Sequence, residues 1–196
     1  SDVCSSDLSM LGEIQSGHLE QVGYDTYCTL LDEVVKEMQG VEVEPEIDIQ
    51  IDLNVTSYIP DEYIPDSAQK IEVYQNIALC KKEEDIQNVV DEIIDRFGNM
   101  PAELENLLDI ARIKYLAKPF AISKIASKKT AVVFTFEQSK YEIDLQGLLK
   151  IYRNKIKFSP GIKTMITLDI GTTNERQILN DVTDYPYDPT PFVKIS

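Results

Sequence analysis

The chain has 196 residues, and 43% of them are hydrophobic, which is enough for one ordinary domain with its own core and an additional segment. Its net charge is −15, but residues 1–100 carry −18 whereas residues 101–196 carry +3. Such a negative first half repels phosphate backbones, which argues against autonomous DNA binding by that half. Its expected partner is a basic protein surface, and the alternative is that the acidity only keeps the chain soluble.

Several classes of protein are excluded by simple patterns. No apolar run approaches the roughly 20 residues that span a bilayer, and no charged and then apolar leader opens the chain. We therefore expect neither membrane insertion nor a secretory signal, and a cytoplasmic location. The cysteines, Cys4, Cys28 and Cys80, form no CxxC pair, which argues against a disulfide framework or a zinc site.

The first 45 residues are predicted to form a unit separate from the rest. Residues 1–8 lack hydrophobic periodicity and are interpreted as a non-native or assembly-derived leader. From Ser16 onward, apolar residues recur mostly at steps of three and four residues, which predicts one long amphipathic helix that ends at Gly40. The apolar residues of this helix are Leu19, Val22, Tyr27, Leu30, Leu31, Val34 and Met38. The acidic linker 41–46, which contains Pro45, then separates residues 9–45 from a domain over 46–196.

Three helices are predicted in the first part of that domain. Asp66 or Ser67 is expected to cap a helix that runs to about Cys80, with the inner face Ile71, Tyr74, Ile77 and Ala78. The apolar residues within 86–97 have helical spacing, which predicts a second helix that ends at Gly98. Its apolar stripe is Ile86, Val89, Val90, Ile93, Ile94 and Phe97. Asn99 is expected to cap, or nearly to cap, a third helix with Pro101 in its first turn and Pro119 at its end. The apolar stripe of this helix is Leu104, Leu107, Leu108, Ala111 and Tyr115.

Alternating apolar and polar residues predict strands on both sides of these helices. The period is two residues over 47–55, and short strands are expected at 122–126, 131–137, 140–143 and 163–169, the first two of these four forming a hairpin. Short helices are expected at 145–152, capped by Asp144, and around 174–182. The fold class is therefore α+β: a long N-terminal helix, then about three helices packed with a small, largely antiparallel sheet.

A search for chemistry finds no active site. The chain has no GxxxxGK[ST] or GxGxxG motif, and its only histidine, His18, excludes sites that need two imidazoles. The acids Glu83, Glu84 and Asp85 stand at the head of a helix, where they complement the macrodipole. From the residues alone, the chain is a cytosolic α+β domain without catalytic residues.

Two groups of motifs resemble bacterial transcription-repair coupling factors. The first is LGEIQSG at 11–17, followed by VGYDTY at 22–27 and LLDE at 30–33. The second includes IPD at 64–66, EIIDRFGNMP at 92–101 and LLDIAR at 107–112. The resemblance covers residues 9 to about 136, and it implies the end of a RecG-like translocase motif followed by the C-terminal regulatory domain.

The resemblance assigns Gln15, Ser16 and Gly17 to the loop that couples ATP hydrolysis to translocation. The arginine-bearing hairpin that this loop needs is absent, so no catalytic residue, nucleotide site, metal or cofactor is expected in this fragment; ATP and Mg belong to the parent motor. The resemblance also implies that residues 46–196 bind the N-terminal repair module of the parent and mask its repair-recruitment surface. RNA polymerase and duplex DNA are expected as partners of the parent.

Two other functions stay open. The basic second half, with Lys128, Lys129, Lys155 and Lys157, is compatible with a nucleic-acid-binding accessory domain, for which a steep salt dependence of DNA affinity is expected. An independent enzyme that uses a carboxylate pair is the poorest alternative, because neither spacing nor setting singles out a pair.

Overall fold

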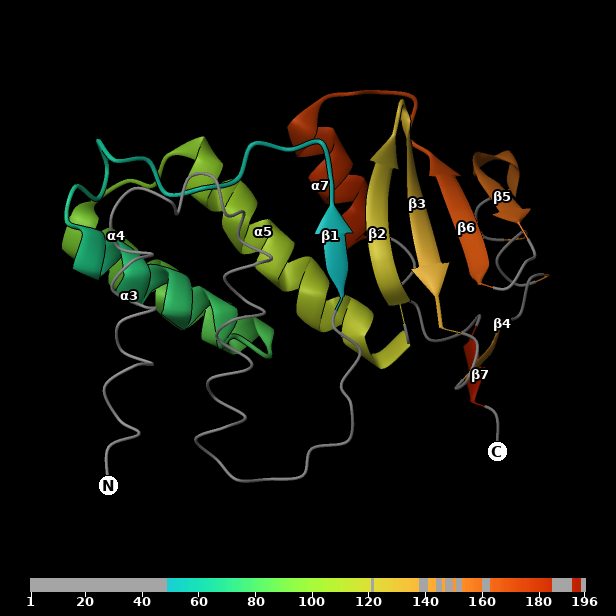
Figure 1. Cartoon of the computed structure of the whole chain (residues 1–196), viewed down its shortest axis with the longest axis horizontal. Helices are drawn as coiled ribbons and strands as arrows, with labels where there is room; N and C mark the ends of the chain where they lie inside the picture. Colours follow the sequence, from blue (N-terminus) through green and yellow to red (C-terminus); the bar gives the residue numbers. More distant parts are fainter. Residues whose placement is uncertain are drawn as a thin grey trace, which may run out of the picture.

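The computed structural model describes residues 49–120, 122–137, 141–143, 146, 150, 153–159, 163–184 and 192–194. The described part is α+β: a group of helices at one end continues into a layer of helix against sheet (Figure 1). The predicted long N-terminal helix lies outside the described residues, as do the leader 1–8 and most of the expected helix 145–152. No helix of the described ranges is long and apolar enough to cross a membrane.

Four α-helices are described, and two of them begin at a side-chain cap. Helix α3 spans Ser67–Ala78, α4 spans Glu83–Phe97, α5 spans Ala102–Ala117 and α7 spans Glu175–Thr183. Asp66 caps α3 by accepting a hydrogen bond from the backbone N–H of Gln69 at 2.9 Å, and Asn174 caps α7 in the same way through Gln177 at 3.0 Å. Two short 3-10 helices are η1, Lys118–Phe120, and η2, Arg153–Lys155.

The main sheet has five strands in the order β1-β2-β3-β6-β5. These strands are β1, Gln50–Asp52; β2, Ile122–Lys128; β3, Ala131–Phe136; β6, Thr164–Asp169; and β5, Ile156–Ser159. Strand β1 runs parallel to β2, whereas β2–β3, β3–β6 and β6–β5 are antiparallel. Strands β4, Tyr141–Ile143, and β7, Phe192–Lys194, form a separate antiparallel pair.

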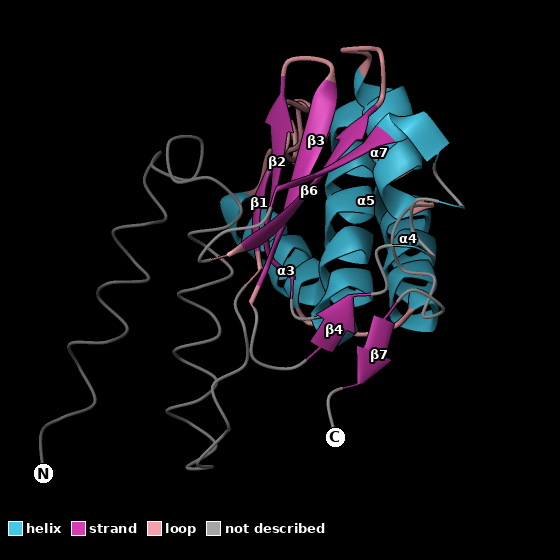
Figure 2. Ribbon diagram, turned by 90° about the vertical axis from the view of Figure 1, so that its right-hand side faces the viewer, coloured by secondary structure: helices cyan, strands magenta, loops and turns pink. Residues whose placement is uncertain are grey.

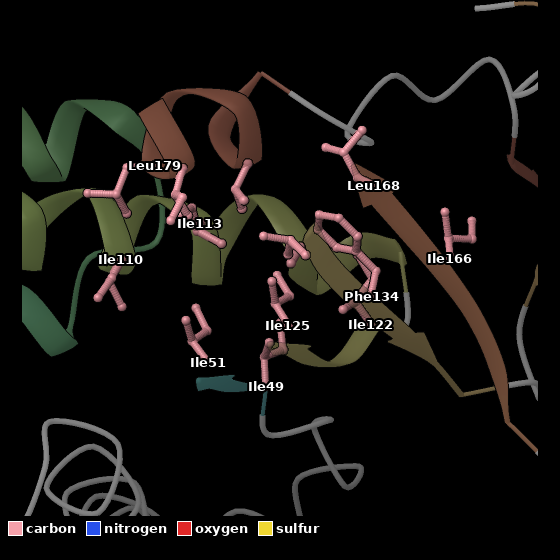
Figure 3. Packing of buried hydrophobic residues seen from close by; sticks show 14 of the residues in the cluster. Ile49, Ile51, Ile110, Ile113, Ile122, Ile125, Phe134, Ile166, Leu168 and Leu179 are labelled. Carbon is pink, nitrogen blue, oxygen red and sulfur yellow. The ribbon is translucent and has the colours of Figure 1, made fainter. Parts of the chain in front are cut away.

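Helices α5 and α7 pack on one face of the main sheet, whereas α3 and α4 lie beyond its β1 edge and pack on α5 (Figure 1 and Figure 2). Helix α5 belongs to both hydrophobic cores: Ile110, Ile113 and Ala117 join the sheet cluster, whereas Leu104, Leu107, Leu108 and Ala111 join the cluster formed with α3 and α4. In the sheet cluster, side chains of β1, β2, β3, α5 and α7 gather between the helices and the sheet (Figure 3). The shared helix therefore joins two cores into one structure.

The comparison with the sequence predictions confirms most elements and corrects several details. The α+β class, the hairpin and the helices starting near residues 67, 86, 102 and 174 are confirmed. The sheet was expected to be largely antiparallel and is mixed: the pairs β2–β3, β3–β6 and β6–β5 are antiparallel, whereas β1 comes from before the helices and inserts parallel to β2. Strand β5 was not predicted, since its burial pattern has one buried residue followed by three exposed ones, which carries no alternation.

The predictions of helix caps and of buried helix faces were also partly wrong. Pro101, not Asn99, is the N-cap of α5 and stands before its first turn. On α3, Lys70 and Val73 are buried, whereas the predicted Ile71 is only half-buried. On α4, Ile94 is 45% exposed although it was assigned to the inner stripe.

Candidate interaction surface

Helix α4 presents an acidic face to solvent. Its inner side is fixed by the buried residues Ile86 and Ile93, which pack against α3 and α5 in the helical core. The opposite side carries the exposed residues Glu84, Asn88, Asp91 and Asp95, which follow one another at helical steps of three and four. Beside them Ile94 is 45% exposed, so an apolar side chain lies within an acidic surface. We call Asp91, Ile94 and Asp95 the α4 patch.

Among the residues that the structure describes, no cation pairs with the acids of the α4 patch. Within the described ranges, Asp91 and Asp95 form no ion pair; Asp91 accepts one hydrogen bond, from the side chain of Gln87 at 3.0 Å. By contrast, Glu92 pairs with Arg96 at 2.7 Å on the same helix. Unpaired carboxylates beside an exposed isoleucine are suited to contact a basic protein surface with an apolar component.

The C-terminal end of α4 is held by several contacts. Arg96 binds Glu72 of α3 at 3.0 Å as well as Glu92, and its guanidinium carbon lies 5.0 Å from the centroid of the Phe97 ring. Carboxylates therefore raise the pKa of Arg96, with Glu72 as the largest cause. The next residue, Gly98, ends the helix with φ +83°, and its carbonyl accepts a hydrogen bond from the Tyr63 hydroxyl at 2.7 Å. The backbone that follows the α4 patch is thus fixed.

The N-terminal end of α4 is joined to α5. Arg112 donates two hydrogen bonds, each of 2.7 Å, to the two carboxylate oxygens of Glu83, and the Tyr115 hydroxyl donates a third at 2.6 Å. The hydrogen bond from Arg112 lowers the pKa of Glu83. Burial, together with the bond to Glu83, raises the pKa of Tyr115 to about 12. Both ends of α4 are therefore positioned, which presents its acidic face as a rigid surface.

A buried amide links α5 to α7 and to the segment after β1. Asn106 is 5% exposed, and its Nδ2 donates to the carbonyl of Thr56 at 2.8 Å and to Glu175 at 3.3 Å. Its Oδ1 accepts from Arg176 at 2.7 Å. Arg176 also binds Asp109 on α5. This polar group fixes α7 on α5 and is structural in character, because its members satisfy one another.

The basic residues predicted for nucleic-acid binding lie at one end of the main sheet. Lys128 and Lys129 lie at the turn of the β2–β3 hairpin, Lys155 is the last residue of η2, and Lys157 is the second residue of β5. The strand register places these positions at the same end of the sheet, because Lys128 pairs with Ala131 and Ala131 with Asp169, while Lys157 pairs with Thr167, two residues before Asp169. The structure brings the four lysines to one end, which the sequence did not predict.

The residues assigned to translocation coupling, Gln15, Ser16 and Gly17, lie outside the described residues, so that assignment stays a prediction. Among the residues that the structure describes, no group of three or more His, Cys, Asp or Glu is arranged to hold a metal ion. The α4 patch was missed as a unit because Ile94 fits the inner stripe by spacing. The signal that could have revealed it is the acidic run Asp91, Glu92 and Asp95 around that isoleucine.

Comparison with known proteins agrees with the motifs. Residues 53–148 match the TRCF domain family. The transcription-repair-coupling factor of Staphylococcus epidermidis (strain ATCC 35984) is 38% identical over 141 residues, and that of Bacillus subtilis (strain 168) is 36% identical over 145 residues. These alignments cover 71% and 73% of this chain, which spans 12% of the length of either relative.

The fold agrees as well. A crystal structure of the C-terminal domain of transcription-repair coupling factor superposes with a TM-score of 0.58 at 22% identity, and the match covers 69% of this chain and 88% of that structure. The motifs, the family match and the fold thus lead to one assignment. This chain belongs to the transcription-repair-coupling factor family and carries its C-terminal TRCF domain.

Proposed function

We propose that this chain is the C-terminal part of an ATP-dependent DNA translocase that couples transcription to nucleotide-excision repair. Within it, the described domain is a non-catalytic, autoinhibitory interaction module that binds the N-terminal repair module of the same protein and masks the surface that recruits repair proteins. RNA polymerase, duplex DNA, ATP and Mg are then partners and cofactors of the parent motor. Gln15, Ser16 and Gly17 belong to that motor and are idle in this fragment.

The observation that carries the proposal is the α4 patch. Its two aspartates have no cation partner among the described residues, and Ile94 between them is 45% exposed. An exposed apolar side chain gains by being covered, and neighbouring unpaired carboxylates select a basic partner and repel an acidic one. Because α4 is held at both ends by Arg112 and Arg96, little ordering is needed when it binds, and this lowers the entropic cost of the contact.

The test is a binding measurement between the 196-residue chain and the separately expressed N-terminal repair module of the same protein, by isothermal titration calorimetry. We expect a Kd on the order of tens of micromolar or tighter, and weaker binding at high salt. If the chain showed no affinity for the repair module in that range, the autoinhibitory proposal would be wrong. ATP hydrolysis by the isolated chain would contradict the non-catalytic part.

A matched pair of variants tests whether the α4 patch contacts the repair module. Asp95→Lys reverses a charge in the α4 patch close to the C-terminus of α4, where a cation suits the helix dipole, so folding is not expected to suffer. Asp184→Lys makes the same charge change at the exposed C-cap of α7. We expect Asp95→Lys to weaken binding about tenfold or more and Asp184→Lys to change it by less than about twofold. If both variants weakened binding equally, the contact with the repair module would not lie on α4.

A further inference from the structure

A group of cations gathers at one end of the main sheet, where the β2–β3 hairpin turns and β5 begins. The register brings these positions together, because Lys128 pairs with Ala131 and Ala131 with Asp169. Strand β5 begins at the same end of β6, where Ile156 pairs with Leu168, and η2 immediately precedes it. We call the five exposed cations at this position the cationic end, namely Lys128, Lys129, Arg153, Lys155 and Lys157.

The cationic end has an excess of positive charge. Within the described ranges, its five cations form no ion pair. Two acids lie on the strands at this end, and each already has a contact. Asp52 pairs with Lys124 at 4.0 Å, and Asp169 accepts a hydrogen bond from the backbone N–H of Gly171 at 3.0 Å. In a chain of net charge −15, this end is therefore a local surface of the opposite sign.

The charges of the domain are divided between its two parts. Residues 61–97, which contain α3 and α4, carry ten acids and four bases, whereas residues 122–171, which contain β2 through β6, carry nine bases and four acids. Helices α3 and α4 lie beyond the β1 edge of the sheet, and β5 forms the opposite edge (Figure 1). A polyanion can therefore approach the cationic end from the side that is away from the acidic helices.

The backbone has an unusual conformation at two of these cations. Lys129 has φ +58° and Arg153 has φ +49°, and among the described residues these are the two non-glycine residues with positive φ. Side chains with a Cβ disfavour this left-handed region, which glycine and asparagine adopt much more readily. Since lysine and arginine stand at both positions on the same surface, their side chains are expected to have a function that offsets this cost.

Hydrogen bonds between strands fix the backbone that carries the cationic end. The carbonyl of Thr130 accepts hydrogen bonds from the N–H groups of Ile170 at 2.9 Å and Gly171 at 3.0 Å, which joins the hairpin turn to the segment after β6. The backbone N–H of Asn54 donates to the hydroxyl of Ser127 at 3.0 Å, which joins the segment after β1 to the end of β2. Little backbone ordering is therefore needed when the cations bind a ligand, and this lowers the entropic cost.

We propose that the cationic end binds the phosphate backbone of duplex DNA. The hairpin turn and the start of β5 are two to three strands apart, which at about 4.8 Å per strand separates their cations by about 10–15 Å. The major groove of B-DNA is about 12 Å wide, so cations at this spacing can contact phosphates on the two strands that border it. Thr130, exposed beside Lys129, adds a hydroxyl donor, which phosphate oxygens also accept.

The composition of this surface favours a DNA duplex over other partners. The centre of a protein interface is apolar, rich in aromatic residues and poor in lysine, whereas the cationic end consists of four lysines and an arginine. Single strands are held by aromatic side chains on which bases stack. Phe158 of β5 is 38% exposed, but it pairs with Ile166 and therefore lies on the face of the sheet that carries the core. An acidic protein segment is an alternative outcome of the test.

The experiment measures binding of the full 196-residue chain to a fluorescently labelled DNA duplex of mixed sequence, by fluorescence anisotropy at a series of salt concentrations. The test variant is Lys129→Asn/Arg153→Asn. It removes two charges, and because asparagine suits the left-handed backbone, folding is not expected to suffer. The variant Lys129→Arg/Arg153→Lys keeps both charges at the same positions.

The matched control is Lys81→Asn/Lys163→Asn, which removes two charges from exposed lysines outside the cationic end. Lys81 stands between α3 and α4, and Lys163 precedes the end of β6 that pairs with Phe136, opposite the hairpin turn. The control therefore has the same net charge as the test variant. Far-UV circular dichroism of all variants verifies that they are folded.

We expect the wild type to bind the duplex with a Kd on the order of 10 µM at low salt, and the logarithm of its affinity to fall steeply with the logarithm of salt concentration. The test variant should bind about tenfold or more weakly. Its salt slope should be smaller by about 1.8, because each lost phosphate contact contributes about 0.9. The control and the variant that keeps both charges should stay within about twofold of the wild type.

The proposal would be wrong if the wild type did not bind the duplex, or if the test variant and the control weakened binding equally. If a poly-glutamate peptide bound the chain at least as tightly as the duplex, an acidic protein segment would be the partner instead. None of these outcomes affects the proposed contact of the α4 patch with the repair module, because that contact involves other residues and is measured separately.

Discussion

Arg112 on α5 holds Glu83 at the first residue of α4 through two hydrogen bonds of 2.7 Å. The pair joins the helix that supports both hydrophobic cores to the helix that presents the α4 patch. The hydrogen bond from Arg112 lowers the pKa of Glu83 from its ordinary value of 4.5, so the ionised carboxylate is favoured in the folded chain. Several consequences can be measured.

The stability of the domain should depend on Glu83 in acid. Because the pKa of Glu83 is lowered by folding, its stabilisation is complete above the ordinary value of 4.5 and is lost as pH falls through the lower folded value. The side chain is 58% exposed, so solvent screening keeps the effect below about 1 kcal/mol. Urea unfolding at pH 7 and pH 3 should show a smaller difference in the free energy of unfolding for Glu83→Gln than for wild type.

The control for this measurement is Glu84→Gln, in the same first turn of α4, whose side chain is 72% exposed and pairs with Lys82 alone among the described cations. Both substitutions remove one negative charge from the helix N-terminus. If the two variants had the same pH dependence, the Arg112 contact would contribute nothing beyond the helix dipole.

Replacement of Asn106 by alanine should be costly. The substitution leaves the Thr56 carbonyl and the Arg176 guanidinium without a partner that they have in the wild type. We expect a loss of about 1–2 kcal/mol in the free energy of unfolding, because two part-buried hydrogen bonds are lost, one of them to a charged guanidinium. Asn88→Ala, at an exposed position of α4, should be neutral or slightly stabilising, and a similar loss there would show that the buried contacts are unimportant.

Helix α5 should make the two cores unfold together. Leu107 lies in the helical core and Ile113 in the sheet core, and both are 0% exposed. Each alanine variant should lose about 2–5 kcal/mol, whereas Leu79→Ala, at a residue that is 57% exposed, should lose less than about 0.5 kcal/mol. Far-UV circular dichroism and tyrosine fluorescence should report one transition; separate transitions would show that α5 does not couple the cores.

Gly98 should tolerate no other residue without a conformational penalty. Its φ of +83° and ψ of −156° lie in a region that is almost restricted to glycine, while a Cβ added there would meet no atom within 4 Å. Gly98→Ala should therefore cost about 1–3 kcal/mol through backbone strain alone. The neighbouring Asn99→Ala tests local sensitivity, and thermal unfolding that is equally affected in both variants would contradict the assignment to backbone strain.

The elements could be predicted from the sequence where a local signal was strong. Asp66 and Asn174 are followed by helical patterns, and side-chain capping there needs no distant partner, so α3 and α7 begin as predicted. The hairpin of β2 and β3 was predicted for the same reason. By contrast, Ile94 fits the apolar spacing of α4, and only the positions of α3 and α5 leave it exposed. Its place in the α4 patch is therefore a tertiary property.

The sequence by itself determined the α+β class, most helix boundaries and, through its motifs, the family, because these depend on residues close together in the chain. Tertiary structure decided that β1 joins the sheet parallel to β2, that Lys70 and Asn106 are buried, and that lysines from β2 and β5 meet at one end of the sheet. Several of these features arise from contacts between segments 50 or more residues apart, such as β1 with β2 and Asn106 with Thr56. Local periodicity does not predict these tertiary contacts, because it indicates which face of an element is apolar but not which other element covers that face.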